Sequence, residues 1–206
     1  MRLDVDEEEK KTDPGEKEAE EERESSGNAN GILKEILNNS VFLLVVLIVT
    51  LLLVRYVGQR TVVIGESMEH TLQNGDSLIV DKISYRFREP ERFEIIVFPF
   101  IYKDETYYIK RIIGLPGETV RIDENGTIYI NGEVLTESYG AEVMTDPGIA
   151  VNEILLGPGE YFVLGDNRNH SSDSRSAAVG LIPKERIIGR ALVRIWPLNK
   201  IVGLTP

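Results

Sequence analysis

Short segments in which apolar and polar residues alternate dominate the chain from about residue 59 onward. Alternation with a period of two is typical of half-buried β-strands. The pattern predicts strands over residues 61–64, 77–80, 94–98, 106–113, 161–164 and 187–196. These segments follow one another too closely for helices to alternate with them. The pattern therefore favours a single, mostly-β domain over residues 59–206.

Turn residues divide this pattern at regular places. Asn125-Gly126 stands between two short apolar segments within residues 119–130, and this dipeptide is a strong signal of a β-hairpin. Asn131-Gly132 predicts a second turn, and Pro116-Gly117 suits a type II turn. Residues 136–152 have only weak periodicity, so a long loop is expected there.

A second kind of pattern precedes the β segments. Residues 41–54 are apolar except for Thr50, and with their apolar neighbours about 20 residues can span a bilayer. A cleaved signal peptide is disfavoured, because the preceding residues are acidic and no Ala-x-Ala site follows. A soluble helix would show a polar face. The sequence thus predicts one uncleaved transmembrane helix, with an anchor region over residues 31–58.

Charge is concentrated at the N-terminus. Residues 1–30 hold 12 acidic and 5 basic residues, in a chain of net charge -11. Such a segment buries too little apolar surface to fold, which predicts a disordered tail; a docking tail for a basic partner is the alternative. The acidic balance argues against nucleic acid as a partner. The absence of cysteine excludes disulfides, zinc–thiolate sites and a cysteine nucleophile.

The orientation of the anchor is only weakly encoded. Lys34 flanks its N-terminal side, whereas Arg55 and Arg60 flank its C-terminal side. Positive charge tends to stay in the cytoplasm. By itself this count leans toward placing the β-domain inside the cell.

Two residues suggest nucleophilic chemistry. Ser67 lies in the stretch Gly65–Leu72, 13 residues after Val54, so it can be no more than roughly 45 Å from the end of the apolar run. A serine needs a base before it can attack a carbonyl. Lys110 is a candidate, because on a strand it shares a face with Tyr108 and Ile112, and burial lowers the pKa of a lysine. An ordinary solvent-exposed strand lysine is the alternative.

Residues 165–175 form a polar, turn-rich segment after a predicted strand. This segment combines two acids, two arginines and several hydroxyls. A calcium loop is one interpretation, but Arg168 stands where an oxygen ligand is expected. A serine–histidine–acid triad with His170 or His70 is a second. A salt-bridged surface loop is the third.

Taken together, these segments resemble the bacterial type I signal peptidases, which remove signal peptides from exported preproteins. The matching boxes cover roughly residues 35–200 and leave out the acidic tail. They comprise Ser67-Met68 with Thr71-Leu72, Gly75-Asp76 with Val80-Asp81-Lys82, Tyr108 to Glu118, and Gly165 to Arg175. The last box is the most specific.

The resemblance implies a role for each matching residue. Ser67 is expected to be the nucleophile and Lys110 the general base, with Ser171 orienting the Lys110 amine. The ion-pairing residues expected to hold the surrounding loops are Asp166, Asp173, Arg111 and Arg175. The substrate-binding positions expected to line shallow apolar pockets for small residues are Val63, Ile64, Met68, Leu72, Tyr108 and Ile109.

The same resemblance implies an antiparallel-sheet fold, no cofactor and no metal. It places the tail in the cytoplasm and the catalytic domain outside the cell, against the arginine count. The expected partners are signal peptides and membrane lipid, which the apolar stretch 98–102 is expected to reach.

This chain departs from the family pattern at two positions. His70 stands where proline is usual, which removes a φ restraint. Gly65 stands where some members carry a hydroxyl that helps to bind the oxyanion, so backbone amides must serve.

Two other functions are possible for a chain with these features. A self-cleaving repressor would be a soluble DNA-binding protein, and a silent, membrane-tethered β-domain would lack Ser67 or Lys110.

Overall fold

The computed structural model describes residues 34–35, 37–51, 58–204 and 206. It divides into two compact units, Met1–Leu51 and Leu52–Pro206. In the first unit, residues 34–35 and 37–51 are helical, and apolar side chains such as Phe42 and Leu43 are exposed. No helix among the described residues is both long and apolar enough to cross a membrane. The predicted tail, residues 1–30, and residues 31–33, 36 and 52–57 of the predicted anchor lie outside the described residues.

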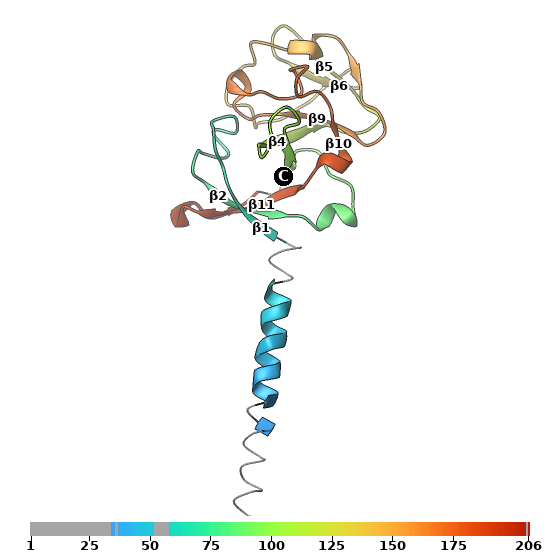
Figure 1. Cartoon of the computed structure of the whole chain (residues 1–206). Helices are drawn as coiled ribbons and strands as arrows, with labels where there is room; N and C mark the ends of the chain where they lie inside the picture. The colour runs from blue at the N-terminus through green and yellow to red at the C-terminus, as the bar shows by residue number, and fades with distance from the viewer. Residues whose placement is uncertain (1–33, 36, 52–57, 205) are drawn as a thin grey trace, which may run out of the picture. The chain divides into compact units, whose positions relative to one another are not determined.

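The second unit is built from short strands, as the alternating pattern predicts (Figure 1). The longer strands are β1 (Gly58–Val62), β2 (Ser77–Asp81), β3 (Ile95–Pro99), β4 (Tyr107–Gly114), β5 (Thr119–Ile122), β6 (Ile128–Ile130), β9 (Glu160–Leu164) and β11 (Gly189–Trp196). The two-residue strands are β7 (Glu133–Val134), β8 (Ile154–Leu155), β10 (Ile182–Pro183) and β12 (Val202–Gly203). Short 3-10 helices occupy η1 (Ser84–Arg86), η2 (Gly148–Val151), η3 (Arg168–His170), η4 (Lys184–Arg186) and η5 (Leu198–Lys200).

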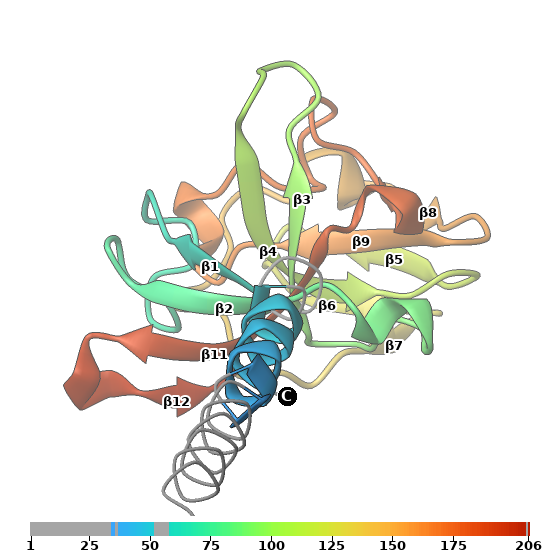
Figure 2. The same cartoon turned by 60° about the horizontal axis from the view of Figure 1, so that its bottom comes forward.

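The strands form two antiparallel sheets. The larger has the order β1-β2-β11-β3-β4-β9-β10, with β12 paired to β11, and the smaller has the order β7-β6-β5-β8. Every strand pairing among the described residues is antiparallel. This confirms the prediction of a mostly-β, antiparallel fold. The hairpin of β3 and β4 projects from the rest of the unit, as does that of β11 and β12 (Figure 2).

Strand β4 is shared between two environments. Its first half pairs with β3, from Tyr107 opposite Pro99 to Arg111 opposite Ile95. Pairing with β9 begins only at Arg111 and is irregular before Gly114. Residues 107–110 therefore have one edge that is not paired to β9.

Three apolar clusters hold the sheets together. One joins the small sheet to β4 and β9 and contains Val120, Ile122, Ile128, Ile130, Ile113, Phe162 and Leu164. A second lies below the turn that carries Ser67. The third contains Ile112, Phe98 and Tyr161, with Tyr108 and Phe100 packed against it. The first cluster fixes the small sheet, and its β7–β8 connection, against the strand that carries Lys110.

Most differences from the predicted elements are small. Strand β1 ends at Val62, although Val63 continues the pairing through hydrogen bonds with residues 75 and 76. The predicted turn at Asn131-Gly132 is confirmed, since both residues have positive φ, 52° and 81°, as a type I′ turn requires. The two-residue strands and η2 were not predicted, because so few residues cannot show a period.

The contact between β11 and β2 predicts which glycine the fold requires. A Cβ at Gly189 would overlap the carbonyl oxygen of Asp81 in β2, whereas one at Gly203 would meet nothing within 4 Å. Gly189→Ala should lower the free energy of unfolding by about 1–3 kcal/mol, as overpacking does. Gly203→Ala should be neutral or stabilising by up to about 1 kcal/mol. Urea unfolding of the full chain in detergent, followed by circular dichroism, gives both values. Equal midpoints for the two variants would contradict the packing described.

Candidate active site

The turn that carries Ser67 is anchored from below by apolar side chains. Met68 and Leu72 expose 1% and 0% of their surface and pack with Val63 in one cluster. The amide of Leu72 donates to the carbonyl of Met68 at 2.7 Å. Ser67 itself is half-buried. The turn therefore holds this serine at the surface, while Val63, Met68 and Leu72 fill the core.

The two departures from the family pattern have different structural consequences. The backbone at His70 has φ of 81°, which a proline ring with φ near -65° cannot adopt. At this position the chain therefore has a conformation that the family's usual proline could not adopt. It also lacks the φ restraint that proline provides. Gly65 also has positive φ, 101°, and its amide donates to Oδ1 of Asn74 at 3.1 Å.

Lys110 lies directly against the serine. It is in β4, exposes 3% of its surface, and its Nζ lies 2.7 Å from Oγ of Ser67 and 2.9 Å from the carbonyl oxygen of Ile109. The ring of Tyr108 lies 5.0 Å from the same nitrogen. Burial lowers the pKa of Lys110 to about 8, although nearby Asp173 and Asp166 act in the opposite direction. A large fraction of this amine is therefore neutral near pH 8.

A buried ion pair lies next to Lys110 in the chain. Nε and Nη2 of Arg111 donate hydrogen bonds to Oδ1 and Oδ2 of Asp166, at 2.9 and 2.7 Å. The hydroxyl of Thr71 donates to the same carboxylate. Arg111 and Asp166 expose 2% and 0% of their surface. This pair joins β4, the Ser67 turn and the segment 165–175, which we call the 165–175 loop.

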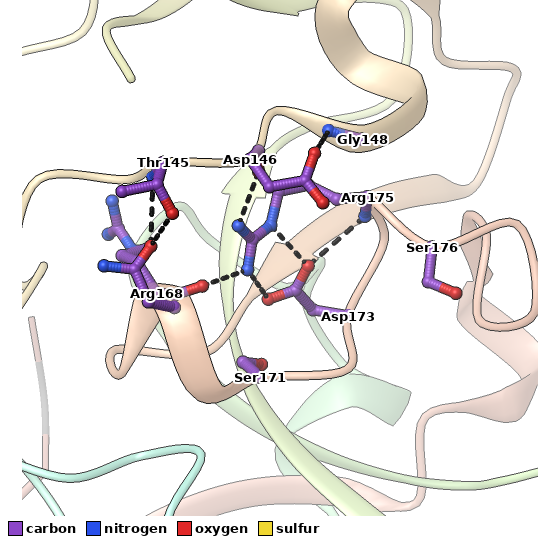
Figure 3. Close-up of a pocket in the computed structure, with 9 residues that line it drawn as sticks. Thr145, Asp146, Gly148, Arg168, Ser171, Asp173, Arg175 and Ser176 are labelled. Atoms are coloured by element: carbon purple, nitrogen blue, oxygen red, sulfur yellow. Dashed lines mark hydrogen bonds and ion pairs between the residues drawn. The ribbon is translucent and has the colours of Figure 1, made fainter. Parts of the chain in front are cut away.

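A second buried pair stabilises the 165–175 loop internally (Figure 3). Arg175 donates to the two carboxylate oxygens of Asp173 at 2.8 and 2.9 Å, and the amide of Gly165 also donates to Asp173. A Cβ at Gly165 would overlap both Oγ of Ser171 and the carbonyl oxygen of Ser67. Only glycine allows the loop to approach the Ser67 turn so closely.

Ser171 lies close to this point but does not make the contact expected of it. Its Oγ is buried and has no hydrogen-bond partner among the described residues, whereas the Lys110 amine contacts Ser67 and Ile109. Ser171 is also one of the residues that line a polar cleft of about 290 Å³ between residues 145–148 and the 165–175 loop. In this structure the amine is oriented by Ser67 and by the carbonyl of Ile109.

A groove of about 570 Å³ runs past Ser67 and Lys110. One wall is formed by residues 61–67 and the other mainly by residues 103–110, with His170 and Ser172 from the 165–175 loop. The edge of β4 that β9 leaves free belongs to the second wall. An extended peptide can pair with such an edge as an added strand.

The six expected substrate-binding residues divide into two groups. Val63, Ile64, Tyr108 and Ile109 line the groove. Met68 and Leu72 do not line it, because they are buried in the cluster that also contains Val63. The two residues are four positions apart and are joined by the hydrogen bond from the Leu72 amide to the Met68 carbonyl, a spacing that brings both side chains to the same side of the turn. They support the groove from below.

Sequence reasoning missed two residues that hold the Ser67 turn. The amide of Asn167 donates to the carbonyl oxygen of Ser67 at 3.1 Å, and its side-chain amide donates to the carbonyl of Glu66 at 3.1 Å. Thr71 bridges to Asp166, as described above. Asn167 and Thr71 both lie within the segments that match the family. That position was the only sequence signal of a role for them.

The calcium-loop and catalytic-triad interpretations of the 165–175 loop receive no support from this geometry. The carboxylates of Asp166 and Asp173 are occupied by arginines, and no cluster of metal-ligating side chains occurs in the part of the chain described. Oγ of Ser67 contacts a lysine, and neither described histidine makes a side-chain hydrogen bond to it.

Comparison with known proteins identifies the family. The model of the family "Signal peptidase, peptidase S26" matches residues 35–196. The chain is 43% identical over 155 residues to the probable signal peptidase I-2 of Synechocystis sp., covering 73% of this chain and 68% of that protein. It is 35% identical over 176 residues to the signal peptidase I of Bacillus licheniformis, covering 79% and 92%.

Among solved structures, a signal peptidase I from Enterococcus faecalis is 35% identical and aligns with a TM-score of 0.40, over 50% of this chain and 97% of that one. The family match covers most of the chain and includes both Ser67 and Lys110. This chain therefore belongs to the signal peptidase family, peptidase S26.

Proposed function

We propose that this protein is a membrane-tethered serine endopeptidase that removes signal peptides from exported preproteins, with Ser67 as nucleophile and Lys110 as general base. The observation that carries the proposal is the 2.7 Å contact between Oγ of Ser67 and Nζ of Lys110, made by an amine whose burial lowers its pKa to about 8. An unperturbed lysine, with a pKa of about 10.4, would be almost wholly protonated at neutral pH and could not accept a proton.

In the first chemical step, Oγ of Ser67 attacks the carbonyl carbon before the cut and its proton passes to Nζ of Lys110. The negative charge moves to the carbonyl oxygen. No described residue accepts a hydrogen bond from the amide of Ser67, so this amide is free to donate to that oxygen. Lys110 then gives its proton to the leaving nitrogen, which breaks the peptide bond and leaves the signal peptide as an ester on Ser67.

In the second step, water attacks the ester carbonyl while Lys110 accepts one of its protons. The ester bond breaks, the proton returns to Oγ of Ser67, and the signal peptide leaves with a carboxylate. One basic group thus serves both steps, as in other activated-serine enzymes.

The groove supports recognition of an extended peptide beside these two residues. The free edge of β4 offers backbone hydrogen bonds, and Val63, Ile64, Tyr108 and Ile109 present apolar surface. The resemblance to signal peptidases, together with these branched and aromatic side chains, supports a preference for small residues such as alanine before the cut.

Replacement of the base tests the mechanism most simply. Lys110→Arg keeps a positive charge but cannot lose its proton, so cleavage of a preprotein should fall by at least about 10³-fold, as should cleavage by Ser67→Ala. Lys103→Arg is the matched control, because Lys103 lines the same groove and should tolerate the change. Near wild-type cleavage by a folded Lys110→Arg variant would refute the proposed base. Absence of Ser67-dependent cleavage by the wild type would favour a silent binding domain.

The pH dependence of cleavage follows from the pKa of Lys110. The base acts in its neutral form, so kcat/KM should rise with pH, reach half its maximum near pH 8, and fall about tenfold per pH unit below that point. His170 also lines the groove, but Oγ of Ser67 is hydrogen-bonded to Lys110 and not to this histidine. His170→Gln should therefore keep the same acid limb. Loss of that limb in His170→Gln would assign the proton acceptor to the histidine.

Two features of the chain support membrane attachment, and the resemblance to signal peptidases supports a catalytic unit outside the cell. The first is the apolar run over residues 41–54. The second is the β3–β4 connection, where the apolar stretch 98–102 separates into two parts. Phe98 is fully buried and Phe100 stacks on Tyr108 at 4.7 Å, whereas Ile101 and Tyr102 expose 59% and 70% of their surface. We infer that these last two residues contact the lipid surface.

Because the chain lacks cysteine, single introduced cysteines can test both the side of the membrane on which the catalytic unit lies and its contact with lipid. Ile101→Cys and Val143→Cys both replace exposed apolar residues. In intact cells stripped of outer layers, a membrane-impermeant maleimide should label Val143→Cys, and should label Ile101→Cys only after detergent is added. Protection of both cysteines until lysis would contradict the orientation. Equal labelling rates without detergent would contradict lipid contact at Ile101.

A further inference from the structure

Residues 137–149 run along the 165–175 loop, and we call this segment the strap. It belongs to the connection between β7 and β8 of the small sheet, the region expected to be a featureless loop. The carboxylate of Glu137 pairs with Nη1 of Arg168 at 2.7 Å, and the two side chains are 11% and 4% exposed. Nε of Arg168 donates in turn to the carbonyl of Gly165 at 3.1 Å. The strap thus supplies the counter-charge for a buried arginine of the loop.

A second contact of the strap reaches the ion pair beside Lys110. The ring of Tyr139 lies 3.7 Å from the guanidinium carbon of Arg111, and Phe93 packs against the same ring, with centroids 5.1 Å apart. Arg111 holds the carboxylate of Asp166, while the backbone carbonyl of Asp166 accepts a hydrogen bond from the amide of Ala141 at 3.0 Å. The strap therefore contacts both members of this pair.

The remainder of the strap follows the loop to its end (Figure 3). The amide and hydroxyl of Thr145 both donate to Oδ1 of Asn169 at 3.0 Å. Arg175 donates to the carbonyl of Asp146 at 2.9 Å, and the amide of Ile149 donates to the carbonyl of Arg175 at 3.0 Å. Contacts are thus distributed along the whole length of the loop.

The opposite side of the 165–175 loop holds the nucleophile. Asn167 donates to the carbonyls of Ser67 and Glu66, and Gly165 packs against the carbonyl of Ser67. The order of contact is therefore strap, loop, Ser67 turn. Because Gly140 lies so near Arg168 that a Cβ there would be 3.1 Å from its Nη1, little space exists for the loop to shift toward the strap.

We propose that the strap sets the position of Ser67 relative to Lys110, with Tyr139 and Glu137 as its positioning residues, acting through Arg111 and Arg168. The inference rests on the proposed function, because the geometry that the strap fixes is that of the serine–lysine pair. Neither Tyr139 nor Glu137 lines the groove, so they act on the rate of the chemical steps and leave substrate binding unchanged.

The experiment compares Tyr139→Leu, which loses the ring, with Tyr139→Phe, which keeps it, in the full chain in detergent. Tyr139→Leu should lower kcat about 10- to 100-fold, the range expected when reacting groups are misplaced, with KM changed by less than about twofold. Tyr139→Phe should retain wild-type kcat. Glu137→Gln should resemble Tyr139→Leu, whereas Glu133→Gln, at an exposed position of β7, should resemble the wild type.

Amide hydrogen exchange provides a second readout that does not depend on turnover. In Tyr139→Leu, the amide of Asn167 should exchange at least about tenfold faster, while the β4–β9 amides stay as protected as in the wild type. An unchanged kcat in Tyr139→Leu would overturn the proposal. Unchanged exchange at the Asn167 amide, or faster amide exchange of equal size throughout the core, would also overturn it. If the wild type shows no Ser67-dependent cleavage, the proposed function fails, while exchange at Asn167 still decides whether the strap holds the loop.

Discussion

The burial of Lys110 against Ser67 is the constraint on which the rest of this structure depends. An amine that exposes 3% of its surface loses the hydration of its charged form, and this loss lowers its pKa. Asp166 and Asp173 oppose the shift, since a nearby carboxylate stabilises the ammonium. Arg111 and Arg175 each neutralise one of these acids through paired hydrogen bonds. The arginines thus limit the charge that Lys110 experiences.

These buried charges also explain why so much of the chain surrounds a two-residue pair. A buried ion pair costs desolvation free energy that only good geometry and further hydrogen bonds recover. Each arginine near the site has such contacts: Arg111 has Asp166 and the Tyr139 ring, Arg168 has Glu137, and Arg175 has Asp173. The small sheet contributes by packing on β4 and β9 and by supplying the strap.

The sequence predicted the parts of this arrangement that have a local signature. Alternation over residues 106–113 predicted β4, and the Asn-Gly pairs predicted the turns of the small sheet. The ordered boxes around Ser67, Lys110 and Gly165 predicted the family, which the comparisons confirm. Each of these signals lies within a few residues of the feature it reports.

Features that depend on contacts between distant segments could not be predicted in this way. Burial of Met68 and Leu72 depends on a cluster that includes residues from β2, β3 and β11. The residue type of His70 does not predict its positive φ. The unpartnered Oγ of Ser171 and the contacts of residues 137–149 depend on how two loops pack. None of these produces a period or a motif in the sequence.

Direct titration of the Lys110 amine tests the central claim, because it measures the neutral base without requiring a substrate. In full-length protein labelled with ¹³C and ¹⁵N at lysine, the side-chain signals of Lys110 can be followed from pH 6 to 11 and assigned by comparison with the Lys110→Arg variant. The account predicts a midpoint near 8. A midpoint near the unperturbed value of about 10.4 would contradict it, because Ser67 would then have no effective proton acceptor at neutral pH.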